Sequence, residues 1–177
     1  MVRYSGLAAL AAALTLLAGI TTTANAQAGF GFAGGPSYPV GELGDVVDSG
    51  FHAGVTMDAG LPLLPVGIRA DLMFQHLPGR AGSASFRQVA GTVAARVGVL
   101  PLPVLSPYLL GGVGLYASSF DPDPEVDGDW GTDAGINFGA GVRLNLLVIR
   151  PFVEARYHRV LSNPGRGFVP ITVGVHF

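Results

Sequence analysis

The residues best suited to catalysis lie near the C-terminal end of the chain. His158 is followed by Ser162 and preceded by Glu154. A serine becomes a nucleophile when a histidine accepts its proton and a carboxylate orients the histidine. In an extended strand, Glu154 and His158 share one face because side chains alternate every two residues. The spacing permits a hydrolase, but the alternative, a polar histidine followed by a Ser-Asn-Pro-Gly turn, agrees better with ordinary turn chemistry.

A second feature with chemical potential is the acidic run at residues 121–129. Clustered carboxylates attract hard cations such as Ca²⁺, and Asp123, Glu125 and Asp127 loosely follow the start of an EF-hand loop. The position of the bidentate carboxylate is taken by Ala134, and the two prolines of the run oppose a wrapped loop. We therefore expect a solvated acidic loop. The four histidines have no metal-ligand spacing, and no phosphate-binding loop is present, so the sequence predicts no metal, cofactor or catalytic site.

Composition narrows the classes of protein to which the chain can belong. It has 177 residues, of which 49% are hydrophobic and only 12% are charged, with 27 glycines, no cysteine and a formal net charge of −2. Nucleic-acid binding requires a basic surface that this charge balance does not supply. The lack of cysteine excludes disulfide scaffolds and thiol chemistry. So few charges are unusual for a protein surrounded by water.

The first 26 residues have the features of a cleaved signal peptide. Arg3 provides a positive start, an apolar stretch runs from Leu7 to Ile20, and Ala24-Asn25-Ala26 supplies the small residues of a cleavage site. A membrane-spanning helix is the alternative, but it needs roughly 20 apolar residues. We predict a signal peptide at residues 1–26, export from the cytoplasm, and one domain at residues 27–177.

The mature chain is predicted to be all-β. Apolar and polar residues alternate with a period of two, and the alternating segments are separated by Gly, Pro and Asp. We count eight strands, with seven or nine as alternatives, and find no helical periodicity. The segments are residues 28–34, 51–61, 66–75, 88–97, 108–120, 133–145, 149–159 and 169–177.

The connections between these segments alternate in character. Those after the second, fourth and sixth strands carry no charge, whereas those after the odd strands are longer or more polar. Outer-membrane barrels have short periplasmic turns and longer external loops. We expect the odd connections outside the cell and both termini on the periplasmic side.

The polar face of the strands combines glycines with charges of both signs. A small barrel lumen has just enough room for side chains, so such a face fits an interior in which charges neutralise one another. A soluble barrel would instead place Lys and Glu outside. We therefore expect the apolar face to meet lipid. The predicted interior charge network consists of Asp58, Arg69, Asp71, Arg96, Arg143, Glu154 and Arg156.

Aromatic residues near the predicted strand ends are suited to the girdles that barrels place at membrane interfaces. Ordinary core aromatics of a soluble sheet are the alternative. The predicted girdle residues are Phe51, Phe74, Tyr108, Tyr116, Phe120, Tyr157 and Phe177.

Several segments resemble a known family. The C-terminal ITVGVHF, the Gly111-Gly112-Val113-Gly114 run and INFGAGV at residues 136–142 are similar to the small bacterial outer-membrane β-barrels, which include OmpA-like and opacity-type barrels of the porin family. The resemblance implies an up-and-down transmembrane barrel that the outer-membrane assembly machinery folds, with Phe177 as the assembly signal. Unlike full OmpA proteins, the chain has no peptidoglycan-binding domain after the barrel, so we expect no anchoring to the cell wall.

One class of small outer-membrane barrels is a lipid A deacylase with a His-x-Ser-Asn pattern. In this chain three residues separate His158 from Ser162, so the spacing differs. The sequence is compatible with four functions. We expect a non-enzymatic outer-membrane barrel with a filled lumen that contributes to envelope structure or acts through its external loops. The alternatives are a lipid hydrolase, a narrow channel and a soluble ligand-binding barrel.

Overall fold

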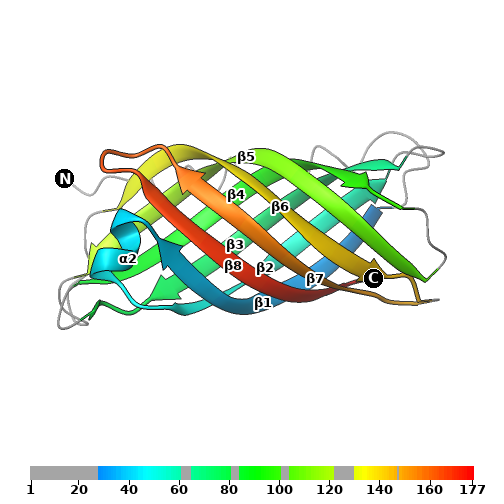
Figure 1. Cartoon of the computed structure of the whole chain (residues 1–177), viewed down its shortest axis with the longest axis horizontal. Helices are drawn as coiled ribbons and strands as arrows, with labels where there is room; N and C mark the ends of the chain where they lie inside the picture. The colour runs from blue at the N-terminus through cyan, green and yellow to red at the C-terminus, as the bar shows by residue number, and fades with distance from the viewer. Residues whose placement is uncertain (1–27, 61–64, 81–83, 101–103, 122–129, 147) are drawn as a thin grey trace.

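The computed structural model describes residues 28–60, 65–80, 84–100, 104–121, 130–146 and 148–177 (Figure 1). The predicted signal peptide and residues 122–129 of the acidic run lie outside the described residues. Within the described part, no helix is long and apolar enough to cross a membrane.

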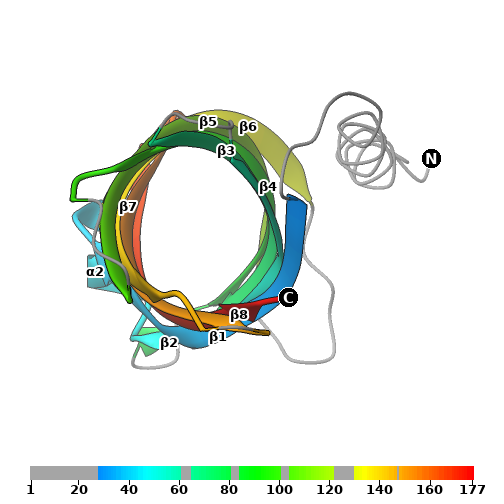
Figure 2. The same ribbon diagram turned by 90° about the vertical axis from the view of Figure 1, so that its right-hand side faces the viewer.

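Eight strands of the described chain form one closed barrel in which each strand pairs with its neighbours in sequence and β1 pairs with β8. Every pairing is antiparallel, and Figure 2 shows the strands encircling a single lumen. The predicted all-β, eight-stranded, up-and-down barrel is confirmed. The strands are β1 (Ala28–Val40), β2 (Gly50–Gly60), β3 (Val66–Leu77), β4 (Ser85–Gly98), β5 (Leu105–Asp121), β6 (Gly131–Leu144), β7 (Arg150–Val160) and β8 (Arg166–His176).

β1 and β5 are among the strands that extend beyond the ranges the sequence predicts. β1 continues to Val40 instead of ending at Gly34, and β5 begins at Leu105, before Pro107. Gly and Pro usually mark turns in a sequence, but here pairing with strands on both sides keeps the backbone extended. Pro36, for example, lies opposite Phe51 of β2. The connection predicted at residues 35–50 is therefore reduced to residues 41–49.

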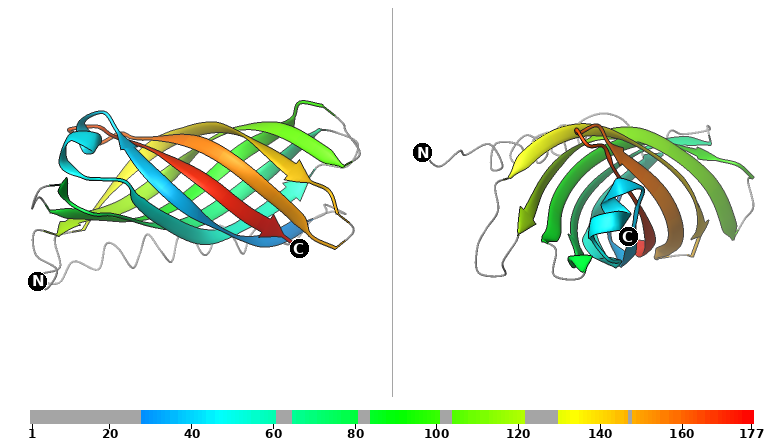
Figure 3. Two further views of the ribbon diagram at one scale, coloured as in Figure 1. Left: turned by 60° about the horizontal axis from the view of Figure 1, so that its bottom comes forward. Right: turned by 60° about the vertical axis from the view of Figure 1, so that its left-hand side comes forward.

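This shortened connection contains a helix that the sequence pattern did not reveal. α2 (Glu42–Val46) has five residues and lies at the barrel end opposite the C-terminus (Figures 1 and 3). Leu43 in the helix and Val47 after it are buried. A helix of about one turn is too short to produce a helical periodicity, so its apolar residues resemble those of any loop.

The wall of the barrel separates apolar from polar side chains as the alternation predicts. Outward-facing residues such as Val113, Phe138 and Val173 are more than half exposed. Inward-facing polar residues such as Arg69, Gln88 and Glu154 are buried. The barrel wall therefore shows a largely apolar surface to its surroundings, and most of the charged strand residues face the lumen. This is the reverse of a water-soluble domain.

The two ends of the barrel differ. β2, β4 and β6 end on the same side of the barrel as the C-terminus, which we refer to as the terminus end. β1, β3, β5 and β7 end on the opposite side, the loop end, where α2 also lies.

Candidate functional site in the barrel lumen

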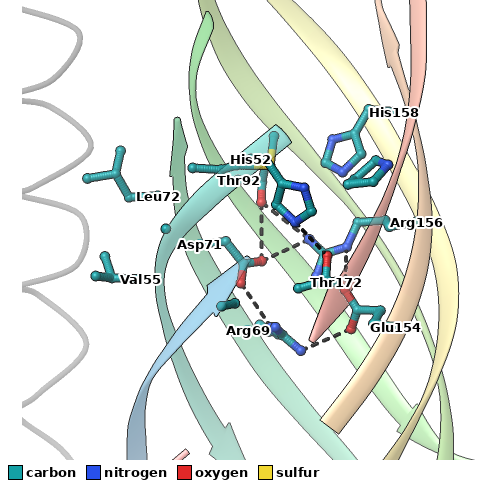
Figure 4. A pocket seen from close by; sticks show the side chains of 14 residues that line it. His52, Val55, Arg69, Asp71, Leu72, Thr92, Glu154, Arg156, His158 and Thr172 are labelled. Atoms are coloured by element: carbon teal, nitrogen blue, oxygen red, sulfur yellow. Dashed lines mark hydrogen bonds and ion pairs between the residues drawn. The ribbon is translucent and has the colours of Figure 1, made fainter. Parts of the chain in front are cut away.

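Four charged side chains meet across the lumen: Arg69 and Asp71 from β3, and Glu154 and Arg156 from β7 (Figure 4). The Arg69 guanidinium lies 2.9 Å from Asp71 Oδ1 and 3.0 Å from Glu154 Oε2. The Arg156 guanidinium lies 2.8 Å from Asp71 Oδ2 and 2.7 Å from Glu154 Oε1. Each arginine contacts both carboxylates, so the four side chains form a closed ring without net formal charge. We refer to them as the ion ring.

Hydroxyl groups on other strands of the barrel support the ion ring. Tyr108 Oη donates a hydrogen bond of 2.8 Å to Glu154 Oε2, and Arg69 Nε donates one of 3.0 Å to Thr56 Oγ1. The Arg69 guanidinium also lies 4.4 Å from the centre of the Phe152 ring, a favourable arrangement for a cation. A buried charge is tolerated only when it is paired and hydrogen-bonded. The ring meets both conditions.

The position of the ion ring determines what can pass through the lumen. β3 and β7 are separated by three strands in either direction around the barrel, so they lie on opposite walls. The ring bridges these walls, and Arg69, Glu154 and Arg156 are each at least 96% buried. A lumen of eight strands is just wide enough for its own side chains. The ion ring therefore closes the middle of the barrel.

A second charged cluster lies nearer the terminus end. Asp58 accepts two hydrogen bonds of 2.8 Å from Arg96, through Nε and Nη2. Arg143 Nη1 lies 3.8 Å from Asp58 Oδ1, and Arg143 Nε donates to Asn145 Oδ1 at 3.2 Å. The seven residues predicted as an interior charge network thus form two groups, four in the ion ring and three around Asp58.

The loop end of the lumen is closed by apolar side chains. Leu43 and Val47, contributed by the α2 connection, pack against inward-facing residues from five strands. These buried strand residues are Leu77, Phe86, Ala90, Tyr116, Val160 and Phe168. We refer to Leu43, Val47 and these six residues as the apolar plug.

Histidines and hydroxyl groups occupy the layer between the ion ring and the apolar plug. His158 Nδ1 lies 2.9 Å from Tyr116 Oη, and the His158 ring stacks on Phe168 with a centroid distance of 4.7 Å. His52 Nε2 lies 3.0 Å from Thr172 Oγ1. A cavity of about 40 Å³ beside the ion ring is lined in part by His52, Thr92 and His158. This volume suits one or two water molecules rather than an organic ligand.

The residues considered for hydrolysis are not assembled into a catalytic group. His158 is buried in the lumen against Tyr116, whereas Ser162 is half-buried in the connection after β7 and donates its hydroxyl hydrogen to the Pro164 carbonyl oxygen at 2.7 Å. Glu154 is engaged by two arginines and Tyr108. Nucleophilic catalysis requires the serine and the histidine within hydrogen-bonding distance. The described contacts therefore give no support to the hydrolase alternative.

Two of the predicted girdle aromatics are not in a girdle. Tyr108 is 3% exposed and Tyr116 is fully buried, and both point into the lumen. β5 is rich in glycine and has aliphatic residues on both faces, so alternation did not reveal which face is inward. Tyr108 donates a hydrogen bond to Glu154 of the ion ring, and Tyr116 belongs to the apolar plug. Phe51 and Phe177, by contrast, are exposed on the outer surface.

The hydroxyl groups that contact the ion ring belong to Thr56, Thr92 and Tyr108. Alternation places Thr56 and Thr92 on the polar faces of their strands, but their contacts with the ring depend on the register between strands, and Tyr108 was predicted in a girdle. Among the described residues, no group of three or more His, Asp or Glu side chains is arranged to hold a metal ion. Most of the acidic run lies outside the described residues.

Solved structures with the same architecture identify the fold. Neisserial surface protein A matches with a TM-score of 0.67 and 16% identity, over 84% of this chain and 94% of that one. The fold is that of the small outer-membrane β-barrels. The N-terminal barrel domain of Pseudomonas aeruginosa OprF matches this barrel with a TM-score of 0.59 and 14% identity, over 86% and 100% of the two chains. A major outer membrane protein from Thermus thermophilus matches with a TM-score of 0.56 and 14% identity, over 85% of this chain and 98% of that one.

These similarities confirm the architecture that the resemblance implied, an OmpA-like or opacity-type barrel. No protein-family model and no curated protein sequence matches the chain. At 14–16% identity the similarity concerns the fold alone. The role of this barrel must be inferred from its own residues.

Proposed function

We propose that the protein is an integral outer-membrane barrel of a bacterium, exported by a signal peptide of residues 1–26, that acts without catalysis. Its closed body contributes to the envelope, and its loop end faces outward and meets external partners. The observation that supports this most strongly is the inverted barrel wall, with Val113 and Val173 exposed outside and the ion ring buried inside. In lipid such a wall buries its apolar side chains, and closure of the barrel gives every strand a hydrogen-bonding partner on both sides.

The contents of the lumen favour a structural role over transport. The ion ring bridges opposite strands, and the apolar plug closes the loop end. A solute would have to separate two buried ion pairs and displace the α2 connection. We therefore expect no stable ion conductance.

The position of Phe177 at the C-terminus supports the proposal that the outer-membrane assembly machinery folds this barrel. Phe177 is 57% exposed, and its backbone N donates to the Phe30 carbonyl oxygen of β1 at 2.8 Å. The terminal residue thus lies at the seam where the barrel closes. Replacing Phe177 by Ala is expected to lower the amount of folded protein in cells, measured on gels of outer-membrane fractions. An unchanged amount would contradict its role as an assembly signal.

The test of the proposed function is fractionation combined with heat-modifiability. The precursor is expressed in a Gram-negative host, and the outer-membrane fraction is run on a detergent gel with and without boiling. We expect an outer-membrane protein whose mobility changes on boiling, because a closed barrel resists the detergent until it is heated. A soluble periplasmic product without that change would contradict the proposal. Planar-bilayer recordings test the closed lumen separately, and a steady single-channel conductance would show that it is open.

A further inference from the structure

The turns at the terminus end are unusually apolar. The described residues of the β4–β5 and β6–β7 connections include large aliphatic side chains that are exposed, and Val148, at 82%, is the most exposed large hydrophobic residue of the described chain. Isolated exposed aliphatic residues are normal, but a contiguous group needs an explanation. We define the apolar turn patch as Val99, Leu100, Val104, Leu146, Val148 and Ile149.

Hydrogen bonds join the two turns of the apolar turn patch. Asn145 N donates to the Val104 carbonyl oxygen at 2.8 Å, and Asn145 Nδ2 donates to Ser106 Oγ at 2.7 Å. Val99 N donates to the Pro107 carbonyl oxygen at 2.9 Å. Polar groups near the turns are thus bonded to one another. Backbone and side-chain polar groups must be satisfied internally where no water is available.

The exposed apolar side chains of the strands form a band around the outer wall. The two ends of the barrel differ in the residues that follow this band. At the loop end, outward-facing Arg87 pairs with Asp121, and outward-facing Arg159 is exposed. At the terminus end, Arg96 and Arg143 are turned into the lumen toward Asp58. Charged side chains therefore mark the limit of the band at the loop end. At the terminus end, the band continues from the strands through Val104 and Leu146 into the turns.

The side chains of the apolar turn patch favour lipid over a protein partner. All six are aliphatic. Protein interfaces are enriched in aromatic residues and arginine and have a polar rim. The acyl chains of a bilayer make non-directional apolar contacts, and the side chains of Val, Leu and Ile can make such contacts without a specific geometry. Continuity with the outward-facing wall at Leu105 and Leu144 places the patch against the same lipid that covers the strands.

We propose that the apolar turn patch lies within the inner leaflet of the membrane, below the level of the lipid headgroups, instead of in periplasmic water. The barrel is then seated asymmetrically, with its loop end projecting from the bilayer and its terminus end immersed in it. This proposal rests on the proposed function, since it requires a membrane-embedded barrel.

Tryptophan quenching tests the immersion directly. The chain contains a single tryptophan, Trp130, so replacing it by Phe gives a background without tryptophan fluorescence. Val148→Trp and Leu100→Trp, made separately, then report on the two turns. The controls are Val113→Trp, on the wall and 62% exposed, and Ser49→Trp, at an exposed position of the α2 connection. Each full-length mature protein is refolded into phosphatidylcholine vesicles, and folding is verified by heat-modifiability.

Vesicles made with phosphatidylcholine brominated on its acyl chains then quench any tryptophan that lies among those chains. We expect both turn variants to lose fluorescence as strongly as Val113→Trp, and Ser49→Trp to lose little. Turn variants that behave like Ser49→Trp, with Val113→Trp still quenched, would overturn the immersed patch and leave the barrel in the membrane. Weak quenching of Val113→Trp as well would contradict the proposed function itself. Having two turn variants covers the case in which one fails to fold.

Discussion

The ion ring and the apolar plug close the same lumen in opposite ways. The ring consists of charges carried by strands, and its members are fixed by the barrel wall on both sides. The plug consists of apolar side chains, two of which come from the short α2 connection. A ring member cannot be removed without leaving a buried charge unpaired, whereas a plug member leaves only a void. We therefore expect a substitution in the ion ring to lower the free energy of unfolding more than a substitution in the apolar plug.

The largest effect is expected from Arg156→Met, which removes one of the two arginines that Asp71 and Glu154 share and leaves the ion ring with a net negative charge. Breaking a buried pair typically costs about 3–5 kcal/mol, because an uncompensated charge remains. Unfolding by urea in lipid vesicles, followed by gel mobility, measures the free energy of unfolding. The matched control is Arg80→Met, which breaks an exposed ion pair with Asp48 and is expected to cost less than about 1 kcal/mol. Equal effects of the two variants would show that the ring contributes no more than a surface pair.

The plug is tested with two substitutions in the same helix. Leu43 is 2% exposed and Val46 is 42% exposed. Leu43→Ala is expected to lower the free energy of unfolding by about 2–3 kcal/mol, in the lower part of the usual range because the site lies at the end of the lumen. Val46→Ala is expected to change it by less than about 0.5 kcal/mol. The same urea titration distinguishes them, and a loss of stability as large as that of Arg156→Met would reverse the comparison.

A smaller effect is expected from a glycine that gives space to the ion ring. A Cβ atom at Gly141 would lie 2.5 Å from the Tyr108 ring and hydroxyl, so Gly141→Ala must displace the tyrosine that donates to Glu154. Overpacking of this kind costs about 1–3 kcal/mol. Gly60→Ala is the control, because a Cβ there meets nothing within 4 Å. If both variants unfold at the same urea concentration, Tyr108 is not held in place by that contact.

The finest test measures the coupling within the ion ring. Arg69→Met and Glu154→Gln remove two side chains that contact each other at 3.0 Å. The double variant is expected to be more stable than the sum of the single effects predicts, by about 1–3 kcal/mol, since the second substitution removes the charge that the first leaves unpaired. Additive effects within the error of the titration would show that the two residues act independently.

Much of the fold could be predicted from local patterns. Alternation separates the two faces of most strands, and the uncharged connections identify the terminus end. These features are readable because an extended chain exposes its period of two in consecutive residues. The pattern was weakest in β5, where glycines and aliphatic residues occur on both faces, and there Tyr108 and Tyr116 were assigned to the wrong environment.

The sequence by itself determined a closed β architecture with an apolar outside and a charged inside, because these follow from the order of residues along each strand. Only the tertiary structure decided which charges meet. The contact of Arg69 with Glu154 joins strands that are far apart in the chain and opposite in the barrel, so it depends on closure and register. The same holds for Leu43, which becomes part of the plug only when α2 folds against the loop end, and for the separate partners of His158 and Ser162, which are Tyr116 and the Pro164 carbonyl oxygen.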